Sequence, residues 1–402
     1  AIRRLFIFEI ILKINFFLNQ IILFIFLLIF LILPDIYLYL RFIVHLTARR
    51  WLKILYWLPT FLLSTGLLYL VYFSNNAFAE RHTQDIGWFS IFFFLFTAPK
   101  LLLFLCTVIG IPFHKWLRWP RTPFICTGLT LAVVSIVMII YGSFIGRTQF
   151  DVKEVTYSSS KLPSSFDGYR IVQLSDIHIG SWQGNASAIQ NLVNLVNEQH
   201  PDLIVFTGDL VNHRAIELND FQHILAGLKA KDGVYSILGN HDYGPYFRWK
   251  NKQEQDDNLS DLQQRQAAMG WKLLNNSHTI LIQGNDSIAL IGVENEGEPP
   301  FSQYADLPKA MQGTEGMFQI LLSHNPTHWR REVLPESDID LMLAGHTHAM
   351  QLKLGNYSPS SYIYPEWSGM YLEGTRGLYV NVGIGYVGLP FRFGAWPEIT
   401  VL

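Results

Sequence analysis

Cysteine and net charge are both scarce in this sequence. Its 402 residues include two cysteines, Cys106 and Cys126, and both lie in apolar segments. A disulfide framework is therefore excluded. The 30 Lys and Arg residues and the 32 Asp and Glu residues give a formal net charge of −2 at pH 7. The chain thus lacks the basic excess typical of nucleic-acid binding, and we expect no nucleic-acid partner.

Charged side chains are also unevenly distributed along the chain. They make up 15% of the residues, whereas hydrophobic residues make up 50%. Residues 1–150 are mostly Phe, Leu and Ile, whereas residues 151–402 have the composition of an ordinary globular domain. The sequence therefore predicts a membrane domain over residues 1–150 and one folded domain over residues 151–402, long enough for a layered core.

Four apolar runs in the first part are long enough to cross a hydrocarbon core. They cover residues 16–33, 54–73, 88–111 and 124–145. Residues 1–15 mix charged and apolar side chains, which is typical of an interfacial helix, although an extended first span explains them equally well. We therefore expect a multi-pass α-helical membrane region with the lipid bilayer as its partner.

The charges of the connecting loops predict the orientation of these spans. The first and third loops are basic, whereas the second carries Arg81 beside Glu80 and Asp85. The positive-inside rule places the two basic loops in the cytoplasm. The chain is thus interpreted as a protein of the bacterial inner membrane with residues 151–402 on the periplasmic, outer side, although Arg3, Arg4 and Lys13 argue the other way. The basic loop residues are Arg41, Arg49, Arg50 and Lys53, then Lys115, Arg118 and Arg121.

Lys100 follows Pro99 in the middle of the third predicted span. A charge inside the membrane indicates a functional site by default. The structural alternative is a lysine that faces a neighbouring helix or a water pocket beside a proline break.

In the second part, apolar runs end repeatedly in clusters of Asp, Asn and His. IVQLSDIH, DLIVFTGDLVN and VYSILGNHD each read as a buried strand followed by polar residues, and FQILLSH and IDLMLAGHTH repeat the pattern. Open α/β sheets bind ligands at the carboxyl ends of such strands. Asp176 and His178 are two residues apart, so an extended backbone points both side chains the same way. This spacing, repeated by His346 and His348, indicates metal ligands.

These motifs resemble those of the calcineurin-like metallophosphoesterases over roughly residues 152–402. The resemblance implies a four-layer α/β/β/α sandwich and a binuclear metal site. Neither Asn325, where relatives commonly have Asp, nor Ala349, where Gly is common, replaces a ligand. The five signatures are D-x-H at Asp176 and His178, G-D-x-x-N at Gly208 to Asn212, G-N-H-D at Gly239 to Asp242, His324, and G-H-x-H at Gly345 to His348.

The resemblance also implies a role for each motif residue. Two divalent ions are expected, and a ligand set without thiolate suits Mn, Fe, Zn or Mg. His241 is expected beside the phosphate, with Asp242 orienting its ring and Asn212 in a supporting position. Asp176, His178 and His348 are expected to hold the first ion, Asn240, His324 and His346 the second, with Asp209 bridging both.

Other candidates have competing interpretations. Arg392 lies in a C-terminal segment that resembles the family near its site, so it is a candidate substrate-phosphate ligand. The aromatic loop over residues 357–371 is interpreted as hairpin packing or as a lip that touches lipid headgroups. The histidines outside the motifs are interpreted as surface or structural residues; they include His200, His213, His223, His278 and His328.

The sequence therefore predicts a membrane-anchored phosphoesterase. Membrane-associated relatives act on phosphodiester or pyrophosphate bonds of lipid-linked molecules such as UDP-2,3-diacylglucosamine, so a lipid-linked or amphipathic phosphoester is the expected substrate. The alternative is an accessory or scaffold subunit of a membrane complex, with partners in that complex and a vestigial phosphoesterase domain.

Overall fold

A computed structural model describes residue 22 and residues 24–73, 83–299 and 301–402. The chain divides into two compact units, one ending at Tyr141 and the other comprising Gly142–Leu402.

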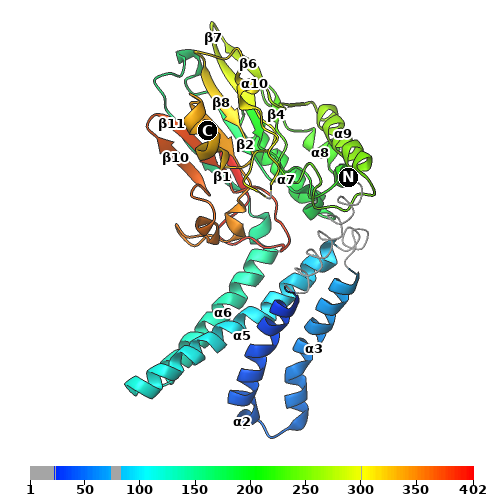
Figure 1. The fold of residues 1–402 in the computed structure, drawn as a ribbon, viewed down its shortest axis with the longest axis vertical. Helices are drawn as coiled ribbons and strands as arrows, with labels where there is room; N and C mark the ends of the chain where they lie inside the picture. Colours follow the sequence, from blue (N-terminus) through cyan, green and yellow to red (C-terminus); the bar gives the residue numbers. More distant parts are fainter. Residues whose placement is uncertain (1–21, 23, 74–82, 300) are drawn as a thin grey trace, which may run out of the picture. The chain divides into compact units, whose positions relative to one another are not determined.

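Among the described residues, four helices are long and apolar enough to cross a membrane, as predicted. The spans are Phe24–Leu46, Arg50–Leu70, Asp85–Leu117 and Thr122–Thr148. The last three lie on α3 (Arg50–Phe73), α5 (Thr83–Leu117) and α6 (Thr122–Phe144) (Figure 1).

The predicted end of the first span, residue 33, is wrong. The helix continues past Pro34 and Asp35, through the π-helical η1 (Tyr39–Ile43), to α2 (Val44–Leu46). Arg41 therefore lies inside the span rather than in the first loop. The predicted start at residue 16 and the amphipathic stretch over residues 1–15 lie outside the described residues.

The helix accommodates Asp35 because the carboxylate of this residue is paired with side chains of other helices in the first unit. Its side chain is fully buried, and Oδ1 lies 2.7 Å from Lys100 Nζ. The Tyr56 hydroxyl donates to Oδ1 at 3.2 Å, and the Thr60 hydroxyl donates to Oδ2. Lys100 thus faces neighbouring helices, in agreement with the structural interpretation. Three of these residues directly follow a proline, in the pairs Pro34–Asp35, Pro59–Thr60 and Pro99–Lys100.

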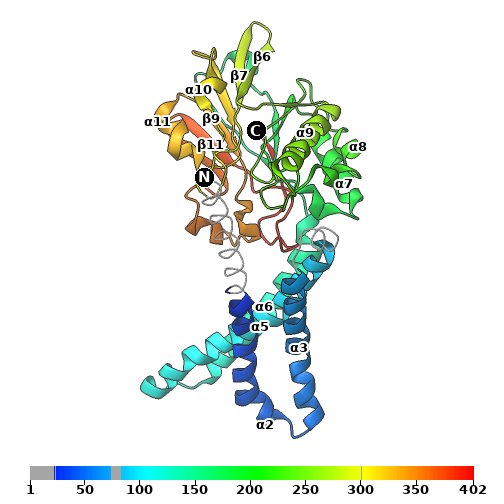
Figure 2. The ribbon, with the colours of Figure 1, turned by 45° about the vertical axis from the view of Figure 1, so that its right-hand side comes forward.

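The second unit is built on two six-stranded sheets (Figures 1 and 2). In the first sheet, β2, β3 and β4 are parallel, so their carboxyl ends meet at one edge. The first sheet has the order β1 (Asp151–Glu154), β12 (Glu398–Val401), β2 (Ile171–Leu174), β3 (Leu203–Phe206), β4 (Val234–Ser236) and β5 (Trp271–Leu273). The second has the order β10 (Gly369–Glu373), β11 (Arg376–Val380), β9 (Leu341–Ala344), β8 (Phe318–Leu322), β7 (Asp286–Gly292) and β6 (Ser277–Gln283).

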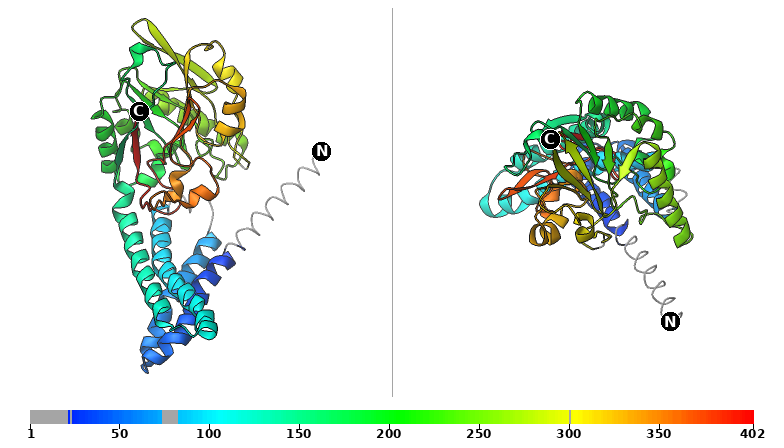
Figure 3. Two further views of the ribbon diagram at one scale, coloured as in Figure 1. Left: turned by 90° about the vertical axis from the view of Figure 1, so that its left-hand side faces the viewer. Right: turned by 90° about the horizontal axis from the view of Figure 1, so that it is seen from above.

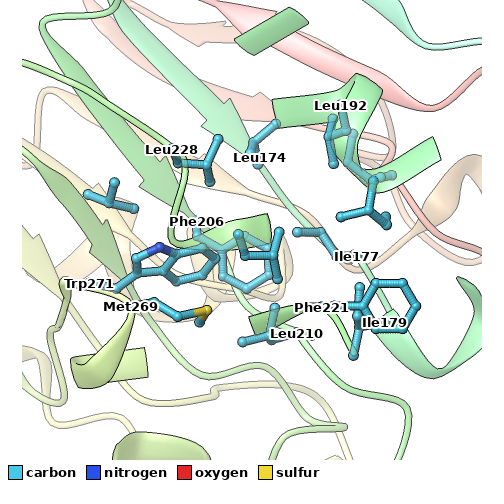
Figure 4. Packing of buried hydrophobic residues seen from close by; sticks show 14 of the residues in the cluster. Leu174, Ile177, Ile179, Leu192, Phe206, Leu210, Phe221, Leu228, Met269 and Trp271 are labelled. Carbon is cyan, nitrogen blue, oxygen red and sulfur yellow. The ribbon is translucent and has the colours of Figure 1, made fainter. Parts of the chain in front are cut away.

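The side chains of each strand alternate between two apolar cores. On β3, Leu203 and Val205 enter a core between the sheets, where they meet residues of β7 and β8 such as Leu290 and Ile320. Ile204 and Phe206 point to the opposite face of the first sheet and pack with helical residues. Figure 4 shows this second core, where the rings of Phe206 and Trp271 are 5.4 Å apart.

Helices cover the outer faces of both sheets, and Figure 3 gives two further views of the layers. The first sheet is covered by α7 (Ala186–Asn197), α8 (Gln222–Leu225) and α9 (Lys252–Ala268). The second is covered by α10 (Leu307–Met311), the π-helical η6 (Trp329–Val333) and α11 (Leu334–Glu336). The predicted α/β/β/α sandwich is confirmed.

Candidate metal centre

The predicted ligands follow the carboxyl ends of strands in both sheets. Asp176, Asp209, His324 and His346 come within two or three residues after β2, β3, β8 and β9. Several of them adopt a left-handed backbone, which is uncommon for residues other than glycine and clusters at functional sites. The φ angles are 53° at Asp176, 46° at His178, 59° at Asp209, 73° at His346 and 50° at His348.

The first ligand group is Asp176, His178 and His348. All three side chains are buried, and their candidate ligand atoms lie within 4.8 Å of one another. Nε2 of His178 lies 3.1 Å from Nε2 of His348, and Asp176 Oδ1 lies 3.3 Å from the same His348 atom. The structure therefore brings together the three residues predicted for the first ion.

The second ligand group is Asp209, His324 and His346, again within 4.8 Å. Nδ1 of His346 lies 3.3 Å from Nε2 of His324. Asp209 Oδ2 lies 3.2 Å from His324 Nε2 and 3.6 Å from His178 Nε2. This one oxygen therefore faces both ligand groups, which is the placement expected of a bridging carboxylate.

Asn240 is the amide predicted for the second ion. Its side chain is buried, and Oδ1 has no hydrogen-bond partner among the residues that the structure describes. A buried acceptor without a donor is costly unless a cation fills the position. The donor set is all oxygen and nitrogen, so the residues fit two divalent ions of the predicted kind.

Burial and the two carboxylates shift the histidine pKa values of the site in opposite directions. Burial by itself lowers the pKa of His324, but the charges of Asp209 and Asp176 outweigh it and raise this pKa to about 10. Burial and the neighbouring His324 lower the pKa of His346 to about 3. The carboxylate charges thus favour positive charge at His324, whose Nε2 lies 3.2 Å from Asp209 Oδ2.

Asp242 does not orient the ring of His241, so this predicted role is wrong. Its fully buried carboxylate accepts four backbone N–H groups and is thereby committed to the ligand-bearing loops. Burial and the charge of Asp209 raise the pKa of Asp242 to about 7. The donors are Asp209 and Gly239 at 2.9 Å to Oδ2, and Leu210 at 2.9 Å and Val211 at 3.2 Å to Oδ1.

The ring of His241 is oriented by a backbone carbonyl instead. Nδ1 lies 2.7 Å from the carbonyl oxygen of Asn212, and the ring centroid lies 4.7 Å from that of His178. The backbone N–H of His241 donates to Asp209 Oδ1 at 2.8 Å. Asn212 therefore supports the site through its main chain, while its Nδ2 donates to Ser181 Oγ at 2.9 Å.

Arg392 has a role different from the predicted phosphate contact. The side chain is fully buried, and Nη2 donates to His348 Nδ1 at 2.8 Å. Its other hydrogen bonds go to the carbonyl oxygens of Gly385, Val382 and Ala395. The guanidinium of Arg392 therefore holds the predicted ligand His348, and its remaining donors are used by backbone carbonyls rather than by a substrate.

Three aromatic side chains lie at the site, and none of them belongs to the five motifs. The Tyr246 ring lies 4.4 Å from that of His241, and Phe301 and Tyr364 lie 4.7 and 5.6 Å from His346. We call Tyr246, Phe301 and Tyr364 the aromatic rim. In the loop over residues 357–371, Tyr364 therefore meets a ligand, whereas Trp367 packs near a small buried cluster. The loop has no regular hydrophobic periodicity, so its sequence does not indicate which aromatic residue contacts the site and which one packs internally.

His213 was interpreted as a surface or structural residue, but its ring lies 6.2 Å from that of His241. It directly follows the G-D-x-x-N motif, which is the one sequence feature that could have identified it. His278 and His328 have structural partners, as interpreted: the carbonyl of Ala310 for the first, Ser323 and Glu332 for the second.

Comparisons with known proteins match both units. The model of the calcineurin-like phosphoesterase family matches residues 169–350, and a probable calcineurin-like phosphoesterase transmembrane domain matches residues 19–147. The metallophosphoesterase YkuE of Bacillus subtilis is 31% identical over 65% of this chain and 87% of its own length. Two proteins described as a transmembrane protein with metallophosphoesterase domain are also similar. The one from Danio rerio is 32% identical over 67% of this chain, and the one from Bos taurus is 29% identical over 75%. The matches span 60% and 70% of those two relatives.

Proposed function

The chain belongs to the calcineurin-like phosphoesterases, as its motifs predict, and from this premise we propose that it hydrolyses a phosphodiester or pyrophosphate bond at a binuclear metal site. One observation carries the proposal: Asp209 Oδ2 lies within 3.6 Å of a histidine nitrogen from each ligand group. Two divalent ions at such a site neutralise charge on phosphoryl oxygens and activate water near neutral pH.

The chain's own residues supply the proton chemistry in this proposal. Nδ1 of His241 is held at the carbonyl of Asn212, so Nε2 is the ring nitrogen left to carry a proton toward the leaving oxygen. Asp242 fixes the loop that bears Asp209 and takes no direct part in the proton transfer. Arg392 fixes His348.

The proposed substrate is an amphipathic or lipid-linked phosphoester. Four spans exceed what anchoring requires, because one transmembrane helix already anchors a protein permanently. Residues 145–150 connect α6 to β1, and six residues reach at most about 22 Å when extended. The aromatic rim favours a substrate with an apolar group beside its phosphate, because Tyr246 is 48% exposed and offers its ring to such a group.

Turnover in a bilayer tests this proposal. The full-length protein in vesicles is given a lipid phosphodiester and, separately, the water-soluble headgroup analogue, and kcat/KM is compared. We expect the lipid to be strongly preferred, and the preference to shrink in detergent micelles. Equal efficiency on both substrates contradicts the lipid-linked assignment. A folded protein that binds no metal and turns over no aryl phosphodiester supports the scaffold alternative.

We also propose that the second unit lies outside the cytoplasm of a bacterial inner membrane. Arg49 remains in the first loop after Arg41 is assigned to the span. Arg50 and Lys53 lie in the first turn of α3, next to this loop, so the charge asymmetry between the loop regions persists. Ser260 is exposed on α9 and provides a labelling site. In a background without Cys106 and Cys126, Ser260→Cys should react with a membrane-impermeant thiol reagent in intact spheroplasts. Labelling only after lysis reverses the orientation.

A further inference from the structure

The two ligand groups differ in the residues that support them. In the first group, Nδ1 of His348 is held by the buried Arg392, and Asp176 Oδ2 accepts from the buried hydroxyl of Ser175. Both supports are fully buried side chains of the folded core. In the second group, the carbonyl oxygen of Thr207 holds Nδ1 of His324 at 2.7 Å. Asn240 and His346 are instead supported by hydroxyl groups of the aromatic rim.

Tyr246 supports Asn240. The amide Nδ2 donates to the Tyr246 hydroxyl at 3.0 Å, while Oδ1 has no partner in the described chain. A carboxamide can turn by 180° and exchange its oxygen for its nitrogen with little change in shape. By accepting from Nδ2, the phenol of Tyr246 selects the orientation in which Oδ1 remains free for a cation.

Tyr364 supports His346 in the same way. The Tyr364 hydroxyl lies 3.1 Å from Nε2 of His346, and Nδ1 of that ring faces His324 Nε2 at 3.3 Å. A neutral imidazole carries one proton, and a hydrogen bond at one nitrogen determines which nitrogen is left as the ligand. With the phenol at Nε2, Nδ1 is the nitrogen available to the second ion.

These contacts join two parts of the chain that are far apart in sequence. Tyr246 lies in the insert between β4 and α9, and Tyr364 lies between the 3₁₀ turn η8 (Pro359–Tyr362) and β10. The tyrosine of each loop contacts a different predicted ligand of the second group, Asn240 for Tyr246 and His346 for Tyr364. Tyr246 is half exposed, in contrast to the fully buried Arg392.

We propose that Tyr246 and Tyr364 are positioning residues for the second ion, so that the placement of the two rim loops determines how tightly this ion is held while the first ion is held by the core. The inference rests on the proposed function, because it takes the two ligand groups to be metal sites. Groups that orient ligands in this way typically change metal affinity or activity by about 10–100-fold when they are removed.

Binding of Mn²⁺ to the full-length protein in nanodiscs tests the proposal. Tyr246→Phe and Tyr364→Phe keep the rings and remove the oxygens, and calorimetric titration gives both dissociation constants. We expect the weaker constant to rise about 10–100-fold and the tighter one to stay within about twofold. The spin-coupled signal of the Mn²⁺ pair should be lost in favour of a single-ion signal at equal metal concentration.

Tyr362→Phe is the matched control, because Tyr362 is 81% exposed on the same loop and contacts Tyr357 rather than a ligand. It should titrate as the wild type does. If both rim variants bind two ions with wild-type constants, the proposal is overturned. Wild-type protein that binds two ions without phosphoester turnover overturns the proposed function and leaves this inference intact.

Discussion

Arg392 donates a hydrogen bond to Nδ1 of His348 at 2.8 Å, from a side chain that is fully buried. This contact explains why the arginine lies in a segment near the site although its side chain binds only groups of the chain itself among the described residues. It orients Nε2 of His348 toward Asp176, 3.3 Å away. Its removal therefore acts on the metal site and on the core together.

Replacing Arg392 with Gln should weaken binding of the first ion by about 10–100-fold. It should also lower the free energy of unfolding by roughly 3–5 kcal/mol, because the carbonyls of Gly385, Val382 and Ala395 lose a charged donor. Metal analysis and urea unfolding measure the two effects. Arg376→Gln is the control: Arg376 also donates to backbone carbonyls, of Ile339, Leu334 and Val333, but reaches no metal ligand. A variant that keeps both ions and changes only KM points to a phosphate contact after all.

Asp209 and His241 should separate metal binding from proton transfer. Asp209→Asn removes the charge that faces both ligand groups, so metal content and turnover should fall together. His241→Ala should keep both ions while turnover falls by about two to four orders of magnitude, the usual size of an acid–base or charge-stabilising contribution. Metal content by mass spectrometry and turnover of an aryl phosphodiester are measured on the same samples. The reverse pattern, with His241→Ala depleted and Asp209→Asn loaded, would show that the two roles are misassigned.

The residues that follow strands could be predicted from the sequence, whereas their supports could not. Asp176 and Asp209 follow β2 and β3 of the first sheet, and His324 follows β8 of the second. The local pattern alone therefore places each of them at the carboxyl end of a strand. The partners of Asp242 could not be predicted from the sequence, because its carboxylate accepts from backbone N–H groups, which every residue except proline carries. Tyr364 depends on the path of a loop without regular periodicity.

The first span illustrates the same limit in the membrane unit. Pro34 and Asp35 indicate a helix end when read locally, because proline breaks hydrogen bonding and a carboxylate is costly in hydrocarbon. The helix continues because Lys100, 65 positions further along, neutralises Asp35. A pairing between distant spans leaves no trace in either local stretch.

His213 should make the protein sensitive to acid. Burial and the neighbouring His241 lower the pKa of His213 to about 4, below its ordinary value of 6.5. The unfolded chain therefore binds the proton more readily, so this contribution to stability is present above pH 6.5 and is lost as pH falls through 4. The full loss is roughly 3 kcal/mol. Unfolding of ion-free protein in urea at pH 7 and pH 4.5 measures it.

His213→Gln removes this titrating group, so its stability should fall less steeply with acid than that of the wild type. His223→Gln, at an exposed position on α8, is the matched control and should follow the wild-type profile. Parallel profiles for His213→Gln and the wild type contradict the assignment.

The last prediction concerns the ion pair between Asp35 and Lys100. Lys100→Met leaves a fully buried carboxylate without its counter-ion, and Asp35→Asn leaves the ammonium without its partner. Each single variant should lose roughly 3–5 kcal/mol of unfolding free energy, because an uncompensated charge remains in an apolar environment. The double variant Asp35→Asn/Lys100→Met removes both charges and should recover most of this loss. Unfolding in mixed detergent micelles measures all three, with Lys115→Met, at an exposed position in the last turn of α5, as the control for losing a lysine. If the double variant loses the sum of the two single losses, the charges act independently, and the continuation of the first helix past Asp35 needs a cause other than this pair.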